Sequence, residues 1–241
     1  MGESMNRMPL AIDLFCGLGG WTEGLLAEGY DVIGFDIDKH EYGDAKYPAQ
    51  LVLQDVLTLH GSQFKGADLI VASPPCQAYS YRAMPWSKAK ALPPPDNSLF
   101  EACFRIQREA CEAAGRHIPM VVENVRGAQK WVGRSRWNYG SFHLWGDVPA
   151  LMPFSSMAVK VAGLNWSNHG KPGYKAEAFN GTAEARLRDD IKNGKDWFGS
   201  GENCSLQRRA GSKSKARKAA SAQIAKIPLP LARYIAAVFK P

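Results

Sequence analysis

Five short apolar segments alternate with helix-like segments between Pro9 and Val125, and this pattern limits the folds open to the chain. In each apolar segment Val, Ile and Leu follow one another almost without a break, whereas a half-buried strand alternates apolar and polar residues. Strands of the first kind are buried on both faces, as in a parallel sheet covered by helices. The apolar segments read LAIDLFCG, DVIGFDID, AQLVLQDV, ADLIVASPP and IPMVVENV. The chain is therefore predicted to form an α/β fold built on a doubly wound, Rossmann-like parallel sheet.

Two helical segments fit between these strands, WTEGLLAEGY and SLFEACFRIQREACEAAG, and Gly29 is expected to end the first of them. After about Trp137 the pattern changes, and residues 139–222 are rich in Gly, Ser, Asn, Lys and Trp without a strong period. The closing segment IPLPLARYIAAVFK regains a helical apolar stripe, which is expected to dock back on the sheet. Its members are Leu231, Tyr234, Ile235, Val238 and Phe239. This organisation predicts a main domain from residues 1–138 and 223–241, and a small irregular domain from residues 139–222.

The charge of the chain favours a polyanionic partner. Its net charge is +7 and its pI is about 9.2. The segment QRRAGSKSKARK contains Arg208 and Arg209 among small polar residues with no apolar face, so it is predicted to be a basic loop that lies along phosphates. A solvated surface loop with no partner is the alternative interpretation.

Several functional classes are disfavoured by the composition. The apolar segments have the length of strands, so we expect no membrane-spanning helix, and the N-terminus does not resemble a secretory signal. The five cysteines form an odd set without a CxxC pair, which argues against a disulfide framework and a metal site. The sequence thus favours a cytoplasmic protein in a reducing compartment, with no metal and no membrane partner.

Polar residues and glycines follow the first three apolar segments. In doubly wound sheets, ligands bind beyond the carboxyl ends of the strands. The glycines of DLFCGLGG allow close approach to a ligand, and Asp36 or Asp38 in DID could accept hydrogen bonds from both hydroxyls of a ribose. Asp55 follows the third segment, at a position suited to accept from an exocyclic amine. Each acid alone is more often a turn or cap residue, but three successive strand ends of this kind indicate a nucleoside-containing ligand.

The fourth and fifth segments end in a thiol and a carboxyl group. Pro74 and Pro75 fix the backbone just before Cys76, as expected for a thiol that must be held at a set distance from a substrate. Glu123 leaves the next strand in ENV, and neighbouring strands lie about 4.8 Å apart, so both groups could face one small ring. No histidine partner is evident, which argues against a papain-like hydrolase.

Together, DLFCGLGG, PPCQAYS and ENV closely resemble the motifs of the DNA (cytosine-5) methyltransferases. The resemblance covers roughly residues 11–136 and returns in AQIAKIPLPLARYIAAV. It implies an S-adenosylmethionine-dependent methyltransferase sheet, with residues 139–222 as the target-recognition region. It also implies duplex DNA as the partner, a cytosine flipped out of the helix, and an enzyme that works as a monomer on nucleoid DNA.

The resemblance assigns catalytic roles. Cys76 would attack C6 of cytosine as a thiolate, and Glu123 would contact N3 and the 4-amino group. Arg134 and Arg136 in VGRSR would orient the flipped cytosine and its backbone, although Val132 stands where the family motif has glutamine.

The resemblance also assigns binding roles. Gln77 and Ser80 would shape the cysteine loop and touch the nearby phosphate or backbone, whereas Arg208 and Arg209 would contact phosphates. Adenine stacking on Phe15 and a ribose held by Asp36 would be the main cofactor contacts. The full cofactor set is Phe15, Gly17, Gly19, Asp36, Ile37, Asp55 and Leu99.

Three alternatives remain open at this point. A cytosine-5 methyltransferase of transfer RNA would share the same motifs. A catalytically silent relative could bind DNA and recruit partners, although Cys76 and Glu123 are both present. A donor that carries a group larger than methyl would depend on the shape of the pocket. The short recognition region predicts a short DNA site or modest specificity.

Overall fold

The computed structural model describes residues 7–42, 44–79, 91, 93–152, 218, 222 and 225–241, and a seven-stranded sheet runs through them. The strand order is β3-β2-β1-β4-β5-β7-β6. The five strands predicted from the sequence pair with one another in parallel, which confirms the doubly wound α/β fold. They are β1 (Leu10–Leu14), β2 (Asp31–Asp36), β3 (Gln50–Leu53), β4 (Leu69–Ala72) and β5 (Met120–Asn124).

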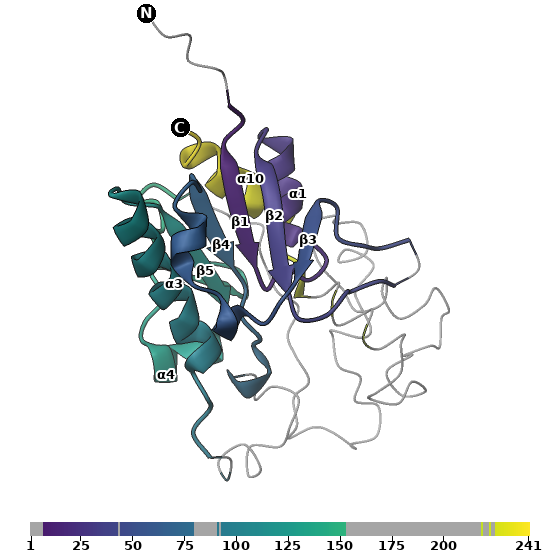
Figure 1. Cartoon of the computed structure of the whole chain (residues 1–241). Coiled ribbons are helices and arrows are strands. Elements are labelled where there is room, and N and C mark those ends of the chain that lie inside the picture. The colour runs from purple at the N-terminus through teal and green to yellow at the C-terminus, as the bar shows by residue number, and fades with distance from the viewer. Residues whose placement is uncertain are drawn as a thin grey trace, which may run out of the picture.

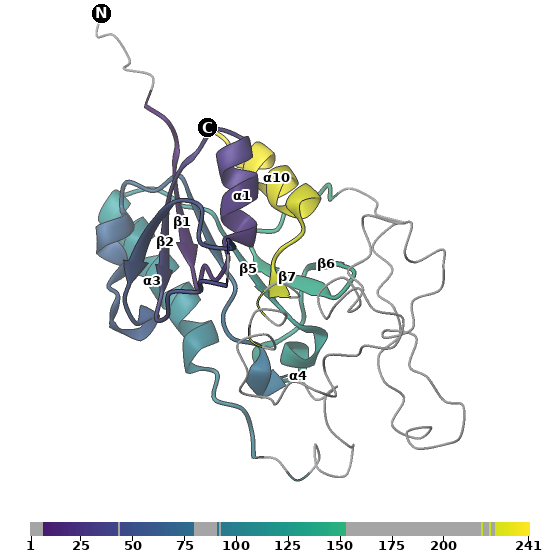
Figure 2. The same ribbon diagram turned by 90° about the vertical axis from the view of Figure 1, so that its right-hand side faces the viewer.

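Helices cover both faces of this sheet (Figure 1). Helix α3 (Ser98–Ala114) packs on one face, where Ile12 and Leu14 of β1 meet Phe100 and Ile106. Helices α1 (Gly20–Ala27) and α10 (Leu229–Val238) lie side by side on the other face (Figure 2). Because successive side chains of a strand point to opposite faces, each inner strand contributes side chains to the hydrophobic core on both faces of the sheet.

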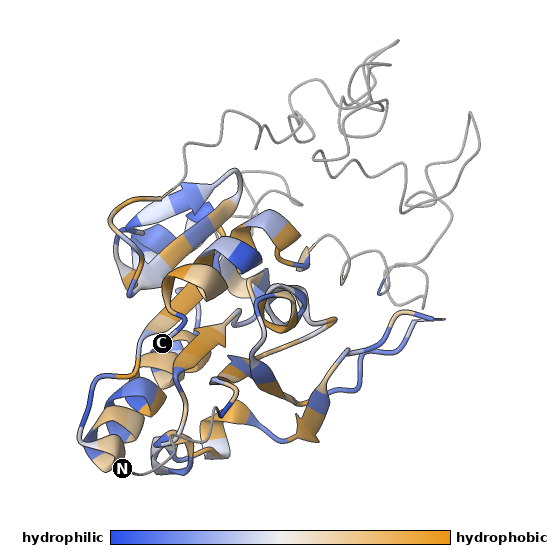
Figure 3. Ribbon diagram, turned by 90° about the horizontal axis from the view of Figure 1, so that it is seen from above, coloured by the Kyte–Doolittle hydropathy of each residue, from blue (hydrophilic) through white to orange (hydrophobic). Residues whose placement is uncertain are grey.

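Burial follows the predicted pattern most closely in the middle of the sheet. Every residue of β4 and of β5 is buried, and Figure 3 shows largely apolar central strands beside helices with one apolar and one polar side. The edge strand β3 is different, since none of its four residues is buried. Full two-sided burial therefore holds for β4 and β5 in the middle of the sheet and not for the edge strand β3.

The sheet continues past the predicted domain boundary at residue 139. Strands β6 (Trp137–Tyr139) and β7 (Phe142–Gly146) form an antiparallel hairpin, and β7 pairs with β5. Gly140 makes the turn with a φ of 59°. The strands are short and carry polar residues such as the buried His143, so they give no strong period in the sequence. This hairpin belongs to the main sheet, and residues 153–217 of the predicted recognition region lie outside the described residues.

The C-terminal segment docks as expected, but with a narrower apolar stripe. Leu231 and Ile235 are buried together with Ala232 and Ala236, whereas Val238 is 45% exposed. The buried face of α10 includes Ala232 and Ala236 because α10 packs closely on α1 at Gly24. A Cβ atom placed on Gly24 would lie 2.4 Å from the Cβ of Ala232. Ion pairs of Lys226 with Glu23 and of Arg233 with Glu28 join the same two segments.

Among the described residues, the structure contains no helix that is both long and apolar enough to cross a bilayer.

We predict that Gly24→Ala lowers the free energy of unfolding by about 1–3 kcal/mol, because the added methyl group overpacks the contact between α1 and α10. Gly66→Ala is the matched control, since a Cβ at Gly66 meets no atom within 4 Å. Urea unfolding monitored by circular dichroism measures both variants. Equal midpoints for the two variants would contradict the close helix crossing.

Candidate active site

The chain turns sharply at the end of β1, below the two glycines of the predicted cofactor loop. Phe15 has a φ of 58°, a left-handed conformation that non-glycine residues rarely adopt, and Gly17 follows with a φ of 51°. A Cβ placed on Gly17 would meet no atom within 4 Å, so the space over this residue is open. Gly19 is different, because a Cβ there would lie 2.5 Å from Cδ of Pro48. Gly17 therefore borders the open side of the loop and Gly19 its packed side.

Asp36, at the end of β2, holds this loop in place. Its Oδ2 accepts a hydrogen bond from the Gly17 amide at 2.9 Å, and its Oδ1 accepts from the Asp38 amide at 3.2 Å. His40 Nε2 lies 3.4 Å from the same Oδ1. Burial opposes ionisation, but the hydrogen bonds from His40, Gly17 and Asp38 prevail and hold the pKa of Asp36 below its usual value. The bond to Asp36 in turn raises the pKa of His40.

The ends of β2 and β3 form the next part of the site. Ile37 follows Asp36 and is 74% exposed, which is unusual for a large apolar residue directly after a buried strand. Asp55 begins the 3₁₀ turn η1 (Val56–Thr58), where its Oδ1 accepts from the Leu57 amide at 2.9 Å. An exposed apolar side chain and a carboxyl group thus stand at the same edge of the sheet as Asp36.

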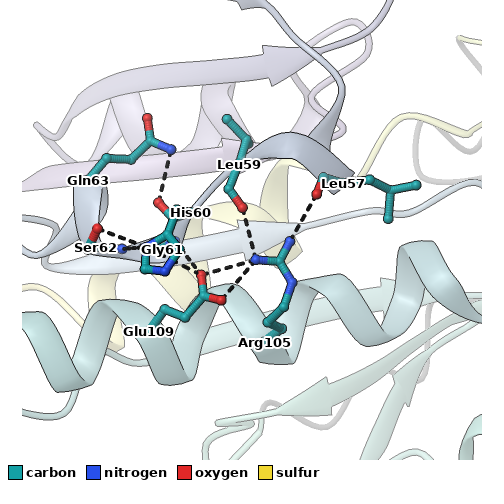
Figure 4. Close-up of polar contacts among 8 residues, drawn as sticks. All are labelled: Leu57, Leu59, His60, Gly61, Ser62, Gln63, Arg105 and Glu109. Carbon is teal, nitrogen blue, oxygen red and sulfur yellow. Dashed lines mark hydrogen bonds and ion pairs between the residues drawn. The ribbon is translucent and has the colours of Figure 1, made fainter.

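Two charged residues of α3 hold the segment that follows Asp55 (Figure 4). Arg105 donates to the carbonyl of Leu59 at 2.9 Å and to that of Leu57 at 3.3 Å. Glu109 accepts from the Gly61 amide at 2.6 Å and pairs with Arg105 at 3.0 Å. No local sequence pattern marks this pair, which joins the segment after Asp55 to helix α3.

The loop after β4 is fixed from two directions. Trp21 in α1 donates to Ser73 Oγ at 3.0 Å, and Asn124 at the end of β5 donates from Nδ2 to the carbonyl of Pro74 at 2.9 Å. Asn124 is 1% exposed, so a buried polar side chain supports the two prolines before Cys76. This bond explains the asparagine of ENV as a support for the cysteine loop.

The predicted catalytic pair lies at the ends of neighbouring strands. β4 and β5 pair in parallel with Ala72 opposite Val122, so Glu123 leaves its strand beside the start of the loop that carries Cys76. Glu123 is only 8% exposed, whereas Cys76 is partly exposed. The structure therefore brings the thiol segment and the carboxyl group to one edge of the sheet, and their catalytic roles stay predictions.

The 3₁₀ turn η3 (Gln77–Tyr79) directly follows Cys76. Tyr79 is buried and donates to Asn97 Oδ1 at 2.8 Å, just before α3 begins. Leu99 lies in the first turn of α3 and is partly buried, and Gln77 is exposed. The cofactor role predicted for Leu99 and the loop role predicted for Gln77 stay predictions.

Arg134 and Arg136 are both exposed on the segment between α4 (Gln129–Val132) and β6. Between them, Ser135 faces inward, with its Oγ 3.1 Å from Gln129 Oε1 and 2.9 Å from His143 Nδ1. The arginines are therefore held by a fixed backbone. Ser80, Arg208 and Arg209 lie outside the described residues, and the roles predicted for them stay predictions.

A buried polar cluster under the cofactor loop was also missed by the sequence analysis. Thr22 donates from Oγ1 to Asp13 Oδ2 at 2.6 Å, and the same Oγ1 lies 2.6 Å from the hydroxyl oxygen of Tyr47. Asp13 is fully buried, and its Oδ1 has no hydrogen-bond partner among the described residues. Burial, and less strongly the charge of Asp36, raises the pKa of Asp13 to about 7, against the hydrogen bond from Thr22. An acid inside the apolar run LAIDL was a signal that could have revealed it.

The described residues contain no group of three or more His, Cys, Asp or Glu side chains arranged to hold a metal ion.

Residues 10–131 match the family model of the C-5 cytosine-specific DNA methylases. Among solved structures, a protein named as a DNA modification methyltransferase encoded within an E. coli prophage is 27% identical over 52% of this chain and 34% of its own, with a TM-score of 0.37. The S. pombe Dnmt2 methyltransferase is 17% identical over 52% of this chain and 36% of its own, with a TM-score of 0.35. The Entamoeba histolytica methyltransferase EhMeth is 18% identical over 52% of this chain, with a TM-score of 0.37.

The matched part of the chain thus spans only 34% to 40% of the length of these three proteins. No curated protein matches the chain.

Asp13 should make the stability of the protein depend on pH. Its pKa lies near 3.8 in an unfolded chain and near 7 in the folded protein, so the folded state binds the proton more tightly. Stability is therefore expected to fall as the pH rises between these two values, by at most about 1.4 kcal/mol per pH unit.

Asp13→Asn removes this titration, so its urea-unfolding free energy should fall less between pH 4.5 and 7.5 than that of the wild type. Asp31→Asn changes an exposed carboxyl group of β2 and should retain the wild-type profile. Parallel pH profiles for the wild type and Asp13→Asn would show that the proton is not held at Asp13.

Proposed function

The chain belongs to the C-5 cytosine-specific DNA methylases, and from this we propose that it transfers a methyl group from S-adenosylmethionine to C5 of a cytosine in duplex DNA. One observation carries the proposal: the loop that carries Cys76 begins at the end of β4, beside Glu123 near the end of the neighbouring strand β5. The hydrogen bond from Asn124 to the Pro74 carbonyl joins the two. The open loop around Gly17 lies at the same edge, so donor and acceptor sites would be neighbours.

The proposed chemistry begins with Cys76. Its thiolate donates an electron pair to C6 of the cytosine, and the C5–C6 π electrons move toward C5 and the ring nitrogen N3. Glu123 stabilises this charge through hydrogen bonds at N3 and the 4-amino group. C5 would then take the methyl group as the sulfur–methyl bond of the donor breaks, and the donor sulfur would keep the bonding electrons as a neutral thioether. A base then removes the C5 proton, and the Cys76–C6 bond breaks as the C5–C6 double bond reforms. The covalent adduct divides one difficult alkylation into easier steps.

The residues of the first three strand ends fit the proposed cofactor. The space over Gly17 gives a ligand room to approach the backbone, and the ionised Asp36 suits the two hydroxyls of a ribose. Ile37 offers an exposed apolar surface for the adenine ring, and Asp55 an acceptor for its amine. Phe15, Gly19 and Leu99 complete the proposed set. When bound, S-adenosylmethionine supplies an electrophilic methyl group.

Duplex DNA is the substrate that the family favours, and the net charge of +7 suits a polyanion. The target atom is inaccessible in a stacked duplex, so the cytosine must leave the helix to reach Cys76. The odd set of five cysteines without a CxxC pair is in keeping with a reducing cytoplasm. We propose a monomer that acts there on nucleoid DNA.

We predict that the protein incubated with labelled S-adenosylmethionine forms 5-methylcytosine in duplex DNA and not in transfer RNA. Cys76→Ser should lower the rate by about three orders of magnitude because the nucleophile is lost, and Glu123→Gln by about 10²–10³-fold. Digestion and identification of the labelled nucleoside give the readout. Cys111→Ser is the matched control, since this partly buried thiol lies in α3, away from the proposed chemistry.

Label in transfer RNA alone would replace DNA with RNA as the substrate. An absence of label in both, with tight DNA binding retained, would identify a catalytically silent relative.

Asp36→Asn should weaken S-adenosylmethionine binding by about tenfold or more, because the charged acceptor for the ribose and the loop is lost. Asp38→Asn is the control: Asp38 is exposed, and only its backbone amide contacts Asp36. Isothermal titration calorimetry measures both dissociation constants. Equal constants for the two variants would remove Asp36 from the proposed cofactor site.

A further inference from the structure

The segment that follows Glu123 has an unusual charge distribution. From Asn124 to Gly146 the chain contains no acidic residue. The same segment contains three arginines and one lysine, which are Arg126, Lys130, Arg134 and Arg136. All four are exposed, and none forms an ion pair with another described residue. We refer to these four residues as the basic tract.

Elsewhere in the described part of the chain, basic side chains are commonly neutralised by acids. Six of these basic side chains form ion pairs with acids, five of them at N–O distances of 2.7 to 3.3 Å and one, Lys226, in a closer contact with Glu23. These pairs are Arg7–Asp68, Lys39–Glu41, Arg105–Glu109, Arg116–Asp68, Lys226–Glu23 and Arg233–Glu28. The basic tract differs in that its four basic residues lie on one segment without an acidic residue, which makes it a local excess of positive charge.

The tract begins at the catalytic edge of the sheet. The 3₁₀ turn η5 (Arg126–Ala128) packs so closely on the cysteine loop that a Cβ on Gly127 would lie 2.1 Å from the carbonyl oxygen of Tyr79. Burial and then the charge of Arg126 lower the pKa of His143, which lies opposite Asn124 in the sheet. The positive charge of Arg126 thus acts on His143, which is the cross-strand neighbour of Asn124.

The backbone under the tract is anchored by internal hydrogen bonds. The Ser135 amide donates to Gln129 Oε1 at 3.2 Å, and Trp145 Nε1 donates to the Gly133 carbonyl at 2.9 Å. Lys130 Nζ lies 4.4 Å from the ring centroid of Trp131. Because the supporting chain is already ordered, little backbone entropy would be lost when these cations bind a charged partner.

We propose that the basic tract binds backbone phosphates of the DNA strand that delivers the cytosine, and that Arg126 and Lys130 add two phosphate contacts to those expected of Arg134 and Arg136. This inference rests on the proposed function. Exposed arginine and lysine side chains without an ion-pair partner among the described residues, in a segment that contains no acidic residue, are the chemistry that a phosphate backbone recognises. Their position directly after Glu123 places the contacts near the target nucleotide.

The test is the salt dependence of binding to a mixed-sequence duplex of 25 base pairs, followed by fluorescence anisotropy from 50 to 300 mM KCl. Each phosphate contact adds about 0.9 to the magnitude of the slope of log K against log salt concentration. Arg126→Ala and Lys130→Gln should each lower that magnitude by about 0.9, and the double variant by about 1.8.

Lys65→Ala is the matched control. Lys65 is exposed at the end of the 3₁₀ turn η2 (Gly61–Phe64), near the amino end of β4, and forms no ion pair with a described residue. Its slope should equal that of the wild type, and thermal unfolding checks that all variants are folded. The proposal is overturned if Arg126→Ala and Lys130→Gln keep the slope of the Lys65→Ala variant.

The same titrations separate this proposal from the proposed function. Wild-type slopes in the tract variants, with 5-methylcytosine still formed in DNA, would reject the tract alone. Binding of transfer RNA but not of duplex DNA by the wild-type protein would reject DNA as the partner of both.

Discussion

The parallel pairing of β1, β2, β3, β4 and β5 is the constraint on which the site depends. In a parallel sheet every strand ends at the same edge, so residues that are distant in sequence become neighbours without any direct bond between them. Gly17, Asp36 and Asp55 reach this edge from three strands, and the loop of Cys76 and the carboxyl group of Glu123 reach it from two more. The hydrophobic burial that stabilises the sheet thus also assembles the polar groups.

Polar side chains then fix the loops that the sheet brings together. Asn124 supports the cysteine loop, Asp36 holds the Gly17 turn, and Arg105 with Glu109 holds the segment after Asp55. These bonds are made by buried or partly buried groups, for which an unmade hydrogen bond would carry a desolvation cost. The loops at the sheet edge are therefore specified by particular partners, although loops in general vary in conformation.

The sequence predicted the inner strands, and placed Cys76 and Glu123 at neighbouring strand ends, because both features depend on local patterns. An apolar run such as ADLIVA predicts a buried strand, and two prolines before Cys76 predict a rigid turn. The contacts of Glu109 with Gly61 join residues that lie 48 positions apart, and no local pattern encodes them. The β6–β7 hairpin was missed for a related reason, since short strands with a buried His143 lack a clear alternation. Asp13 shows the same limit, because only the fold brings Thr22 and Tyr47 to it.

The hydrogen bond from Trp21 to Ser73 joins the two halves of the proposed site. Trp21 lies in the helix that follows the glycine loop, and Ser73 begins the loop that carries Cys76. If α1 shifts when the methyl donor binds at the glycine loop, the hydrogen bond from Trp21 to Ser73 would move the loop that carries Cys76. This coupling would not require a bound substrate. Donor occupancy and nucleophile placement would then be thermodynamically linked, and each would alter the other by the same free energy.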